Sequence, residues 1–146
     1  MPHPNPRLVM KFGGTSVADL GRIEKAADKV AREAQKGAQL AVVVSAMAGV
    51  TNELVGYCQS LSEIHDSREY DTVVSSGEQV TAGLMAIALQ KRGLAARSWL
   101  GWQLPIYCDD SHSQARILDI DDSAIDSRLN QGEIAVVAGF QGGTQK

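Results

Sequence analysis

Six consecutive residues near the start of the chain, Lys11-Phe12-Gly13-Gly14-Thr15-Ser16, have types and a spacing that could bind a phosphate group. A strand that ends in a lysine and then turns through two glycines can present an amine and bare backbone N–H groups to one ligand. The lysine precedes the glycines, so this is not a Walker A loop, and a Rossmann G-x-G-x-x-G motif is absent. The hexapeptide therefore suggests a nucleotide site, although a glycine pair that only lets the chain turn remains an alternative.

Two other segments carry polar residues that could contact a ligand. The segment Ser45-Ala46-Met47-Ala48-Gly49-Val50-Thr51-Asn52-Glu53-Leu54 has small residues that leave room near the backbone, and Ser45 and Thr51 offer hydroxyl groups. Thr51 could equally serve only as the cap of the helix that follows. Glu78, in Ser75-Ser76-Gly77-Glu78, poses the same choice, because this tetrapeptide fits a capping box in which the glutamate returns a hydrogen bond to a helix start.

Strand and helix patterns alternate along the chain and predict where these residues lie. Strands are predicted at residues 7–12, 40–44, 95–100, 106–110, 115–120 and 134–138. Helices are predicted at 17–36 with Ser16 as N-cap, at 50–63, at 70–92 with an interruption or cap at 75–78, and at 121–130. This alternation indicates the α/β class, with a mostly parallel open sheet and helices on both faces. In such sheets ligands bind beyond the carboxyl ends of the strands, where residues 11–16, 45–51 and 139–143 are expected.

Length and composition restrict the class of protein. The 146 residues suit about one domain, and 44% hydrophobic with 21% charged residues is typical of a globular chain. A formal net charge of −3 gives no reason to expect a nucleic acid or an anionic membrane as partner. No apolar run approaches the ~18 residues of a membrane span. Residues 1–6 are expected to form a proline-stiffened tail without the apolar core of a signal peptide, which predicts a cytoplasmic protein.

The two cysteines, Cys58 and Cys108, have no metal-binding spacing around them, so no metal site is predicted. Cys58 falls in an apolar helical pattern, where a buried and inert thiol is expected.

Five motifs, taken together and in order, resemble those of the aspartokinases of the amino-acid kinase superfamily. They are Lys-Phe-Gly-Gly-Thr-Ser, Val-Val-Ser-Ala-Met, Thr-Asn-Glu-Leu, Ser-Gly-Glu and Gly-Phe-Gln-Gly, spread over residues 8–143. The resemblance implies transfer of the γ-phosphoryl group of ATP, with Mg²⁺, to the side-chain carboxylate of L-aspartate. The product would be 4-phospho-L-aspartate, in the first step of lysine, threonine and methionine biosynthesis.

The resemblance also implies roles for individual residues. Lys11 would stabilise the charge on the transferred group, and Lys11, Phe12, Gly13 and Gly14 would contact the nucleotide phosphates. Ser45, Thr51 and Glu78 would hold the amino acid, with the Glu78 carboxylate on its α-ammonium group.

The chain departs from the aspartokinase pattern after residue 143. Family members continue into a Gly-Arg-Gly-Gly-Ser-Asp segment and an adenine-binding region, which are not found in these residues. Residues 7–146 therefore resemble the amino-terminal portion of a catalytic domain, expected to be inactive alone and to associate with itself or with a completing chain. The alternatives are a non-catalytic α/β assembly or binding module, or another amino-acid kinase such as an acetylglutamate or glutamate kinase.

Overall fold

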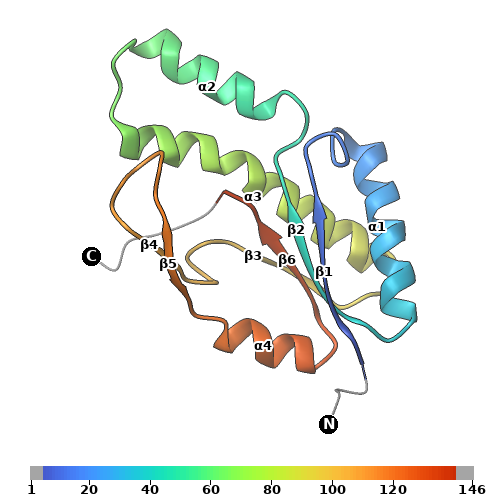
Figure 1. Cartoon of the computed structure of the whole chain (residues 1–146). Coiled ribbons are helices and arrows are strands. Elements are labelled where there is room, and N and C mark those ends of the chain that lie inside the picture. Colours follow the sequence, from blue (N-terminus) through green and yellow to red (C-terminus); the bar gives the residue numbers. More distant parts are fainter. Residues whose placement is uncertain (1–4, 141–146) are drawn as a thin grey trace.

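The computed structural model describes residues 5–140, which form one four-stranded sheet, a small hairpin and four helices (Figure 1). The strands are β1 (Arg7–Phe12), β2 (Gln39–Val44), β3 (Ala96–Trp99), β4 (Ile106–Cys108), β5 (Ile117–Ile120) and β6 (Ile134–Ala138). The helices are α1 (Leu20–Gln35), α2 (Val50–Leu61), α3 (Ser67–Lys91) and α4 (Ser123–Asn130).

The main sheet has the strand order β1-β2-β6-β3, and all of its strands run parallel. β4 and β5, which correspond to the strands predicted at residues 106–110 and 115–120, pair antiparallel in a separate two-stranded hairpin. The predicted α/β class and open parallel sheet are confirmed. β6 is an interior strand, and the free edges of the sheet belong to β1 and β3.

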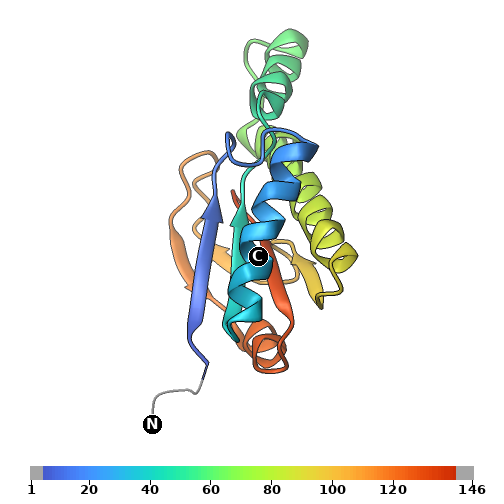
Figure 2. The same cartoon turned by 90° about the vertical axis from the view of Figure 1, so that its right-hand side faces the viewer.

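Helices cover both faces of the sheet, as predicted (Figure 2). α1 and α3 pack on one face over a core that includes Leu40, Val42 and Val136, all at most 1% exposed. α4 packs on the other face through Ile125 and Leu129, which join a smaller apolar cluster with Trp99 and Ala135. The strict alternation of buried and half-buried residues along β2 is that of a strand whose two faces have different covers.

The caps of three helices differ from those that the sequence suggested. α1 begins after Asp19, whose carboxylate accepts a hydrogen bond from the N–H of Arg22 at 2.8 Å, so Ser16 is not its N-cap. α2 begins after Gly49, so Thr51 lies inside the first turn and is not its cap. α3 is continuous through residues 75–78, and its N-cap is Asp66, which accepts from the N–H groups of Arg68 and Glu69.

Burial corrects one further prediction, that for Cys58, and it defines the covered face of α3. Cys58 is half-buried and not enclosed in the core. In the apolar stretch 80–89 of α3, Val80 and Ile87 are 58% and 62% exposed, whereas Thr81, Ala82, Met85 and Ala86 between them are buried. A helix with one covered face produces this outcome, since residues seven apart lie on the same side.

Candidate active site

The register of the sheet aligns the carboxyl ends of three strands. Phe12 pairs with Val44, and Val44 pairs with Ala138, so the residues that follow these three positions emerge at one edge. Backbone hydrogen bonds continue across this edge from the Ser45 N–H to the Phe12 carbonyl at 3.2 Å and from the Gly139 N–H to the Val44 carbonyl at 2.9 Å. The predicted meeting of the three loops is confirmed for the described residues, whereas residues 141–143 lie outside them.

The turn after β1 leaves backbone donors without acceptors. The Gly13 carbonyl accepts from the N–H groups of Ser16 and Val17, at 3.0 and 3.3 Å, which closes the turn. The N–H groups of Gly13, Gly14 and Thr15 donate to no acceptor within residues 5–140. A β-carbon on Gly13 would meet nothing within 4 Å, so this backbone is open to an incoming group. Unpaired N–H groups in a concave turn suit an anion.

Lys11 and Phe12 separate onto the two faces of β1. Lys11 is exposed, whereas Phe12 is buried against the core beneath α1 and α3. The Phe12 side chain thus anchors the turn, and only its backbone lies at the edge of the site. Val9, on the same face as Lys11, is 70% exposed, so this face of β1 is largely uncovered in the described residues.

The turn after β1 and the loop after β2 lie against each other. A β-carbon on Gly14 would be 3.4 Å from the carbonyl oxygen of Ala46, and the N–H of Ala48 donates to the carbonyl of Ala18 at 3.3 Å. Ser45, half-buried, is the first residue of this loop and is adjacent to the Gly13 turn. Thr51 is exposed in the first turn of α2, and its side chain makes no hydrogen bond within the described residues.

Glu78 reaches the same edge of the sheet from the middle of α3. A β-carbon on Gly139 would be 3.8 Å from the Glu78 Cγ atom, and the backbone N–H of Ala46 donates to the Glu78 carboxylate. The sequence did not reveal the donor at Ala46, because a backbone group has no signature in residue type. The capping-box interpretation of Glu78 is wrong, since its own N–H belongs to the interior of a continuous helix.

Glu78 is a buried carboxyl group without a cation. Glu78 is 9% exposed. No Lys, Arg or His among residues 5–140 forms an ion pair with its carboxylate. Burial raises the pKa of Glu78, while hydrogen bonds from backbone N–H groups partly oppose this shift. Buried charges are normally paired, so the site is suited to a ligand that carries a positive charge.

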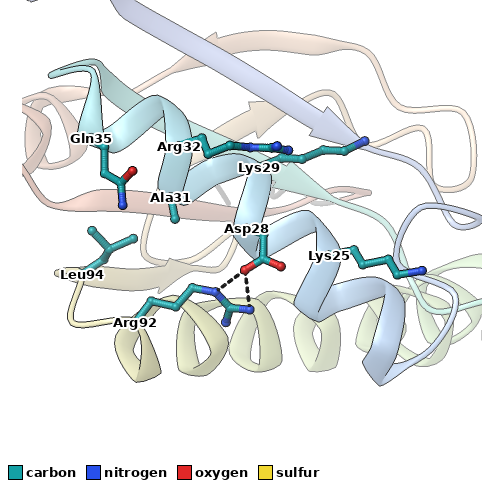
Figure 3. Close-up of a pocket in the computed structure, with 8 residues that line it drawn as sticks. All are labelled: Lys25, Asp28, Lys29, Ala31, Arg32, Gln35, Arg92 and Leu94. Carbon is teal, nitrogen blue, oxygen red and sulfur yellow. Dashed lines mark hydrogen bonds and ion pairs between the residues drawn. The ribbon is translucent and has the colours of Figure 1, made fainter.

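A basic groove elsewhere on the molecule is not part of this site (Figure 3). It lies between α1 and the end of α3 and is lined by Lys25, Asp28, Lys29, Ala31, Arg32, Gln35, Arg92 and Leu94. The Arg92 guanidinium is already paired with Glu24 at 2.6 Å and with Asp28 at 2.9 Å. These ion pairs lower the pKa of Glu24 and raise that of Arg92, as structural contacts between helices do.

No group of three or more His, Cys, Asp or Glu side chains in the described part of the chain could hold a metal ion. No helix of that part is long and apolar enough to cross a membrane.

A family model described as the amino acid kinase family matches residues 6–146. The chain belongs to the amino acid kinase family. This assignment agrees with the parallel sheet and with the lysine and glycine turn at the end of its first strand.

Curated relatives narrow the similarity to one branch of the family. The chain is 48% identical over 138 residues to an aspartokinase of Rickettsia bellii, and 49% identical over 135 residues to an aspartate kinase of Pseudomonas putida. Each alignment covers 92% of this chain, but only 34% and 33% of the relatives. The chain thus spans about a third of the length of the curated relatives that it matches.

Solved structures give the same fold. A Synechocystis aspartate kinase superposes with a TM-score of 0.74 at 37% identity, covering 90% of this chain and 21% of that one. Escherichia coli aspartokinase III in complex with aspartate and ADP superposes with a TM-score of 0.70 at 22% identity, covering 91% of this chain and 40% of that one. A Giardia lamblia carbamate kinase bound to AMP-PNP superposes with a TM-score of 0.71 at 10% identity, covering 97% of this chain and 57% of that one. At this identity the match supports the fold alone.

Proposed function

We propose that this chain supplies the amino-acid site and part of the phosphate site of an aspartate kinase, which transfers the γ-phosphoryl group of ATP to the side-chain carboxylate of L-aspartate. The observation that carries the proposal is the buried, cation-free Glu78 carboxylate at the same sheet edge as the open Gly13–Gly14 turn. An ammonium site beside an anion site suits an amino acid and a nucleotide. The similarity to aspartokinases at 48–49% identity supports aspartate as the acceptor.

The chemistry requires positioning and charge neutralisation more than proton transfer. An aspartate side chain has an ordinary pKa of about 3.9, so the nucleophilic carboxylate is ionised at neutral pH and needs no general base. The protein must bring two anionic groups together in line and stabilise the charge on the transferred group. In this proposal Lys11 and the N–H groups of Gly13 and Gly14 neutralise that charge, with Phe12 anchoring the turn that presents them.

The amino acid is held from the other side of the edge. The Glu78 carboxylate binds its α-ammonium group, and the hydroxyl groups of Ser45 and Thr51 contact its polar groups. ATP carries Mg²⁺, which adds charge neutralisation when bound and is held mainly by phosphate oxygens. The described residues offer no three-ligand metal cluster, so no side chain is assigned to this ion.

The proposal extends to assembly and location. Val80 and Ile87 expose apolar side chains seven residues apart on α3, and Val9 does so on β1, so we expect another chain, or a second copy of this one, to cover such surfaces. The cytoplasm, where ATP and free amino acids occur together, is the proposed location.

A hydroxylamine trap tests the reaction. The complete reading frame that contains residues 1–146 is expressed and incubated with ATP, Mg²⁺, L-aspartate and hydroxylamine, which captures an acyl phosphate as a hydroxamate. N-acetylglutamate and glutamate serve as matched acceptors. Hydroxamate formed only with aspartate supports the proposal; a preference for either other acceptor assigns a different amino-acid kinase, and no product with any acceptor favours a non-catalytic module.

A further inference from the structure

The loop between β4 and β5 is tied to α3 by a single carboxylate. The backbone N–H of Ser113 donates to Asp71 Oδ2 at 3.0 Å, and the Nδ1 atom of His112 lies 3.3 Å from the same oxygen. The Ser113 hydroxyl adds a longer contact to Asp71 Oδ1 at 3.5 Å. Asp71 thus connects two segments that are more than forty positions apart in the sequence.

The conformation of this loop is specified by further bonds. Asp109 accepts from the N–H groups of Ser111 and Arg116 at 3.1 and 3.3 Å, which closes the base of the loop. Ser113 has a φ of 67°, a left-handed conformation that costs energy for a residue with a β-carbon. The bond that its N–H makes to Asp71 offsets this cost, so the tie and the loop shape depend on each other.

Asp71 and Glu78 lie on the same side of α3. They are seven residues apart in a continuous helix, which at 3.6 residues per turn is nearly two full turns. The rise along the axis between them is about 10.5 Å, at about 1.5 Å per residue. Figure 1 shows the β4–β5 loop reaching the amino-terminal end of α3 and β6 ending beneath the same helix. The loop therefore lies on the side of α3 that carries Glu78, about two helical turns along the axis from that residue.

We propose that the β4–β5 loop, residues 109–116, forms a wall of the amino-acid site and that Asp71 is the positioning residue that holds it there. This inference rests on the proposed function, in that Glu78 binds the acceptor ammonium group. In this proposal Asp71 contacts neither the acceptor nor ATP, and it acts through the backbone N–H of Ser113 and the ring of His112. Loss of the tie widens the amino-acid site and leaves the Gly13–Gly14 turn unchanged.

The kinetic test uses the complete protein and compares two aspartates near the start of α3. Asp71→Ala is expected to raise the KM for L-aspartate about fivefold, the effect of losing a hydrogen bond or two, with the KM for ATP within about twofold of wild type. Asp71→Asn is expected to recover part of this loss, since its amide oxygen can still accept from Ser113. Asp66→Ala is the control, because Asp66 caps the same helix end but makes no hydrogen bond to the loop. Equal changes in both alanine variants, or an unchanged KM for aspartate in Asp71→Ala, would overturn the proposal.

Hydrogen–deuterium exchange provides a readout that does not depend on turnover. L-aspartate is expected to slow exchange in peptides covering residues 109–116 of the wild type and to have no such effect in Asp71→Ala. Protection around Glu78 without protection of 109–116 would refute the wall and leave the proposed function standing. If L-aspartate slows exchange in no peptide and no hydroxamate forms, both the proposed function and the proposed role of the loop are wrong.

Discussion

At the scale of single residues, Glu78 departs most from what its local sequence suggests. A Ser-Ser-Gly-Glu segment is a typical helix start, yet Glu78 occupies the interior of a helix and turns a buried carboxylate toward Ala46 and Gly139. A buried carboxylate without a cation is unfavourable for stability, and groups kept at such a cost are common in ligand sites. Burial and charge together, and not the residue type, make Glu78 a candidate for ligand binding.

Replacing Glu78 by glutamine separates its charge from its shape. Because a hydrogen bond to a charged group is worth more than one to a neutral amide, Glu78→Gln in the complete enzyme should raise the KM for L-aspartate about tenfold or more. The KM for ATP should change little. Steady-state kinetics with each substrate varied in turn gives both constants, and an unchanged KM for aspartate would count against the ammonium site.

The raised pKa of Glu78 predicts that the stability difference between the wild type and Glu78→Gln depends on pH. The pKa of Glu78 is higher in the folded protein than in the unfolded chain, so the folded state binds the proton more tightly. The wild type therefore loses stability relative to Glu78→Gln as pH rises from below the unfolded pKa through the folded one. Thermal midpoints are measured without ligands from about pH 4 to pH 8. The midpoint of Glu78→Gln should rise relative to that of the wild type as the pH approaches neutral. A constant difference would mean that Glu78 is not desolvated.

Lys11 should matter for turnover and little for folding. It is exposed and forms no ion pair within residues 5–140, so Lys11→Ala should change the free energy of unfolding by less than about 0.5 kcal/mol. Loss of a cation that stabilises the transition state should lower kcat about 100-fold. Urea unfolding and steady-state kinetics on the same preparation check the two parts, and near-normal turnover would rule out the assigned role.

At the scale of elements, the site depends on how closely α3 approaches the loop after β2. A β-carbon on Gly77 would lie 2.9 Å from the Ala46 Cβ and 3.3 Å from Val50 Cγ1. Glycine is therefore needed here for the approach of two backbones, which in turn brings the Ala46 N–H to the Glu78 carboxylate. This explains why a helix-breaking residue lies in the interior of α3 without ending it.

Two glycines of α3 allow a matched test of that approach. Helix propensity alone favours alanine over glycine by about 1 kcal/mol at either position. At Gly83, where a β-carbon meets nothing within 4 Å, alanine should stabilise the protein by about 0.5–1 kcal/mol. At Gly77 the added β-carbon would collide with Ala46, so Gly77→Ala should destabilise the protein by about 1–3 kcal/mol. Urea unfolding of both variants measures the difference, and stabilisation by Gly77→Ala would show that α3 can move away from the loop.

At the scale of the whole molecule, the sheet formed by residues 5–140 has two unpaired edges, and apolar side chains are uncovered among the same residues. β1 and β3 are the edge strands, and Val9, Val80 and Ile87 are each more than half exposed. Exposed edges and apolar patches tend to recruit other chains. The chain also spans only about a third of the length of its curated relatives.

The polypeptide of residues 1–146 by itself should therefore bind ATP weakly, form no hydroxamate above background and associate with itself. Sedimentation velocity at several concentrations should show an average sedimentation coefficient that rises with concentration. Calorimetric titration with ATP measures the affinity. A stable monomer that binds ATP tightly and phosphorylates aspartate would show that these residues hold a complete site.

Sequence patterns predicted the succession of strands and helices along the chain, the parallel sheet and the meeting of three loops at one edge. These follow from local rules: apolar runs form buried strands, and parallel strands end on the same side. The folded structure was needed to show that α3 is continuous, that Asp19 and Asp66 are the helix caps, and that Glu78 is buried without a cation among residues 5–140. The hydrogen bond between Asp71 and Ser113 could not be predicted from the sequence either, because it joins residues more than forty positions apart through a backbone group. Propensity reports what a segment prefers alone, whereas packing decides which of those preferences the folded chain keeps.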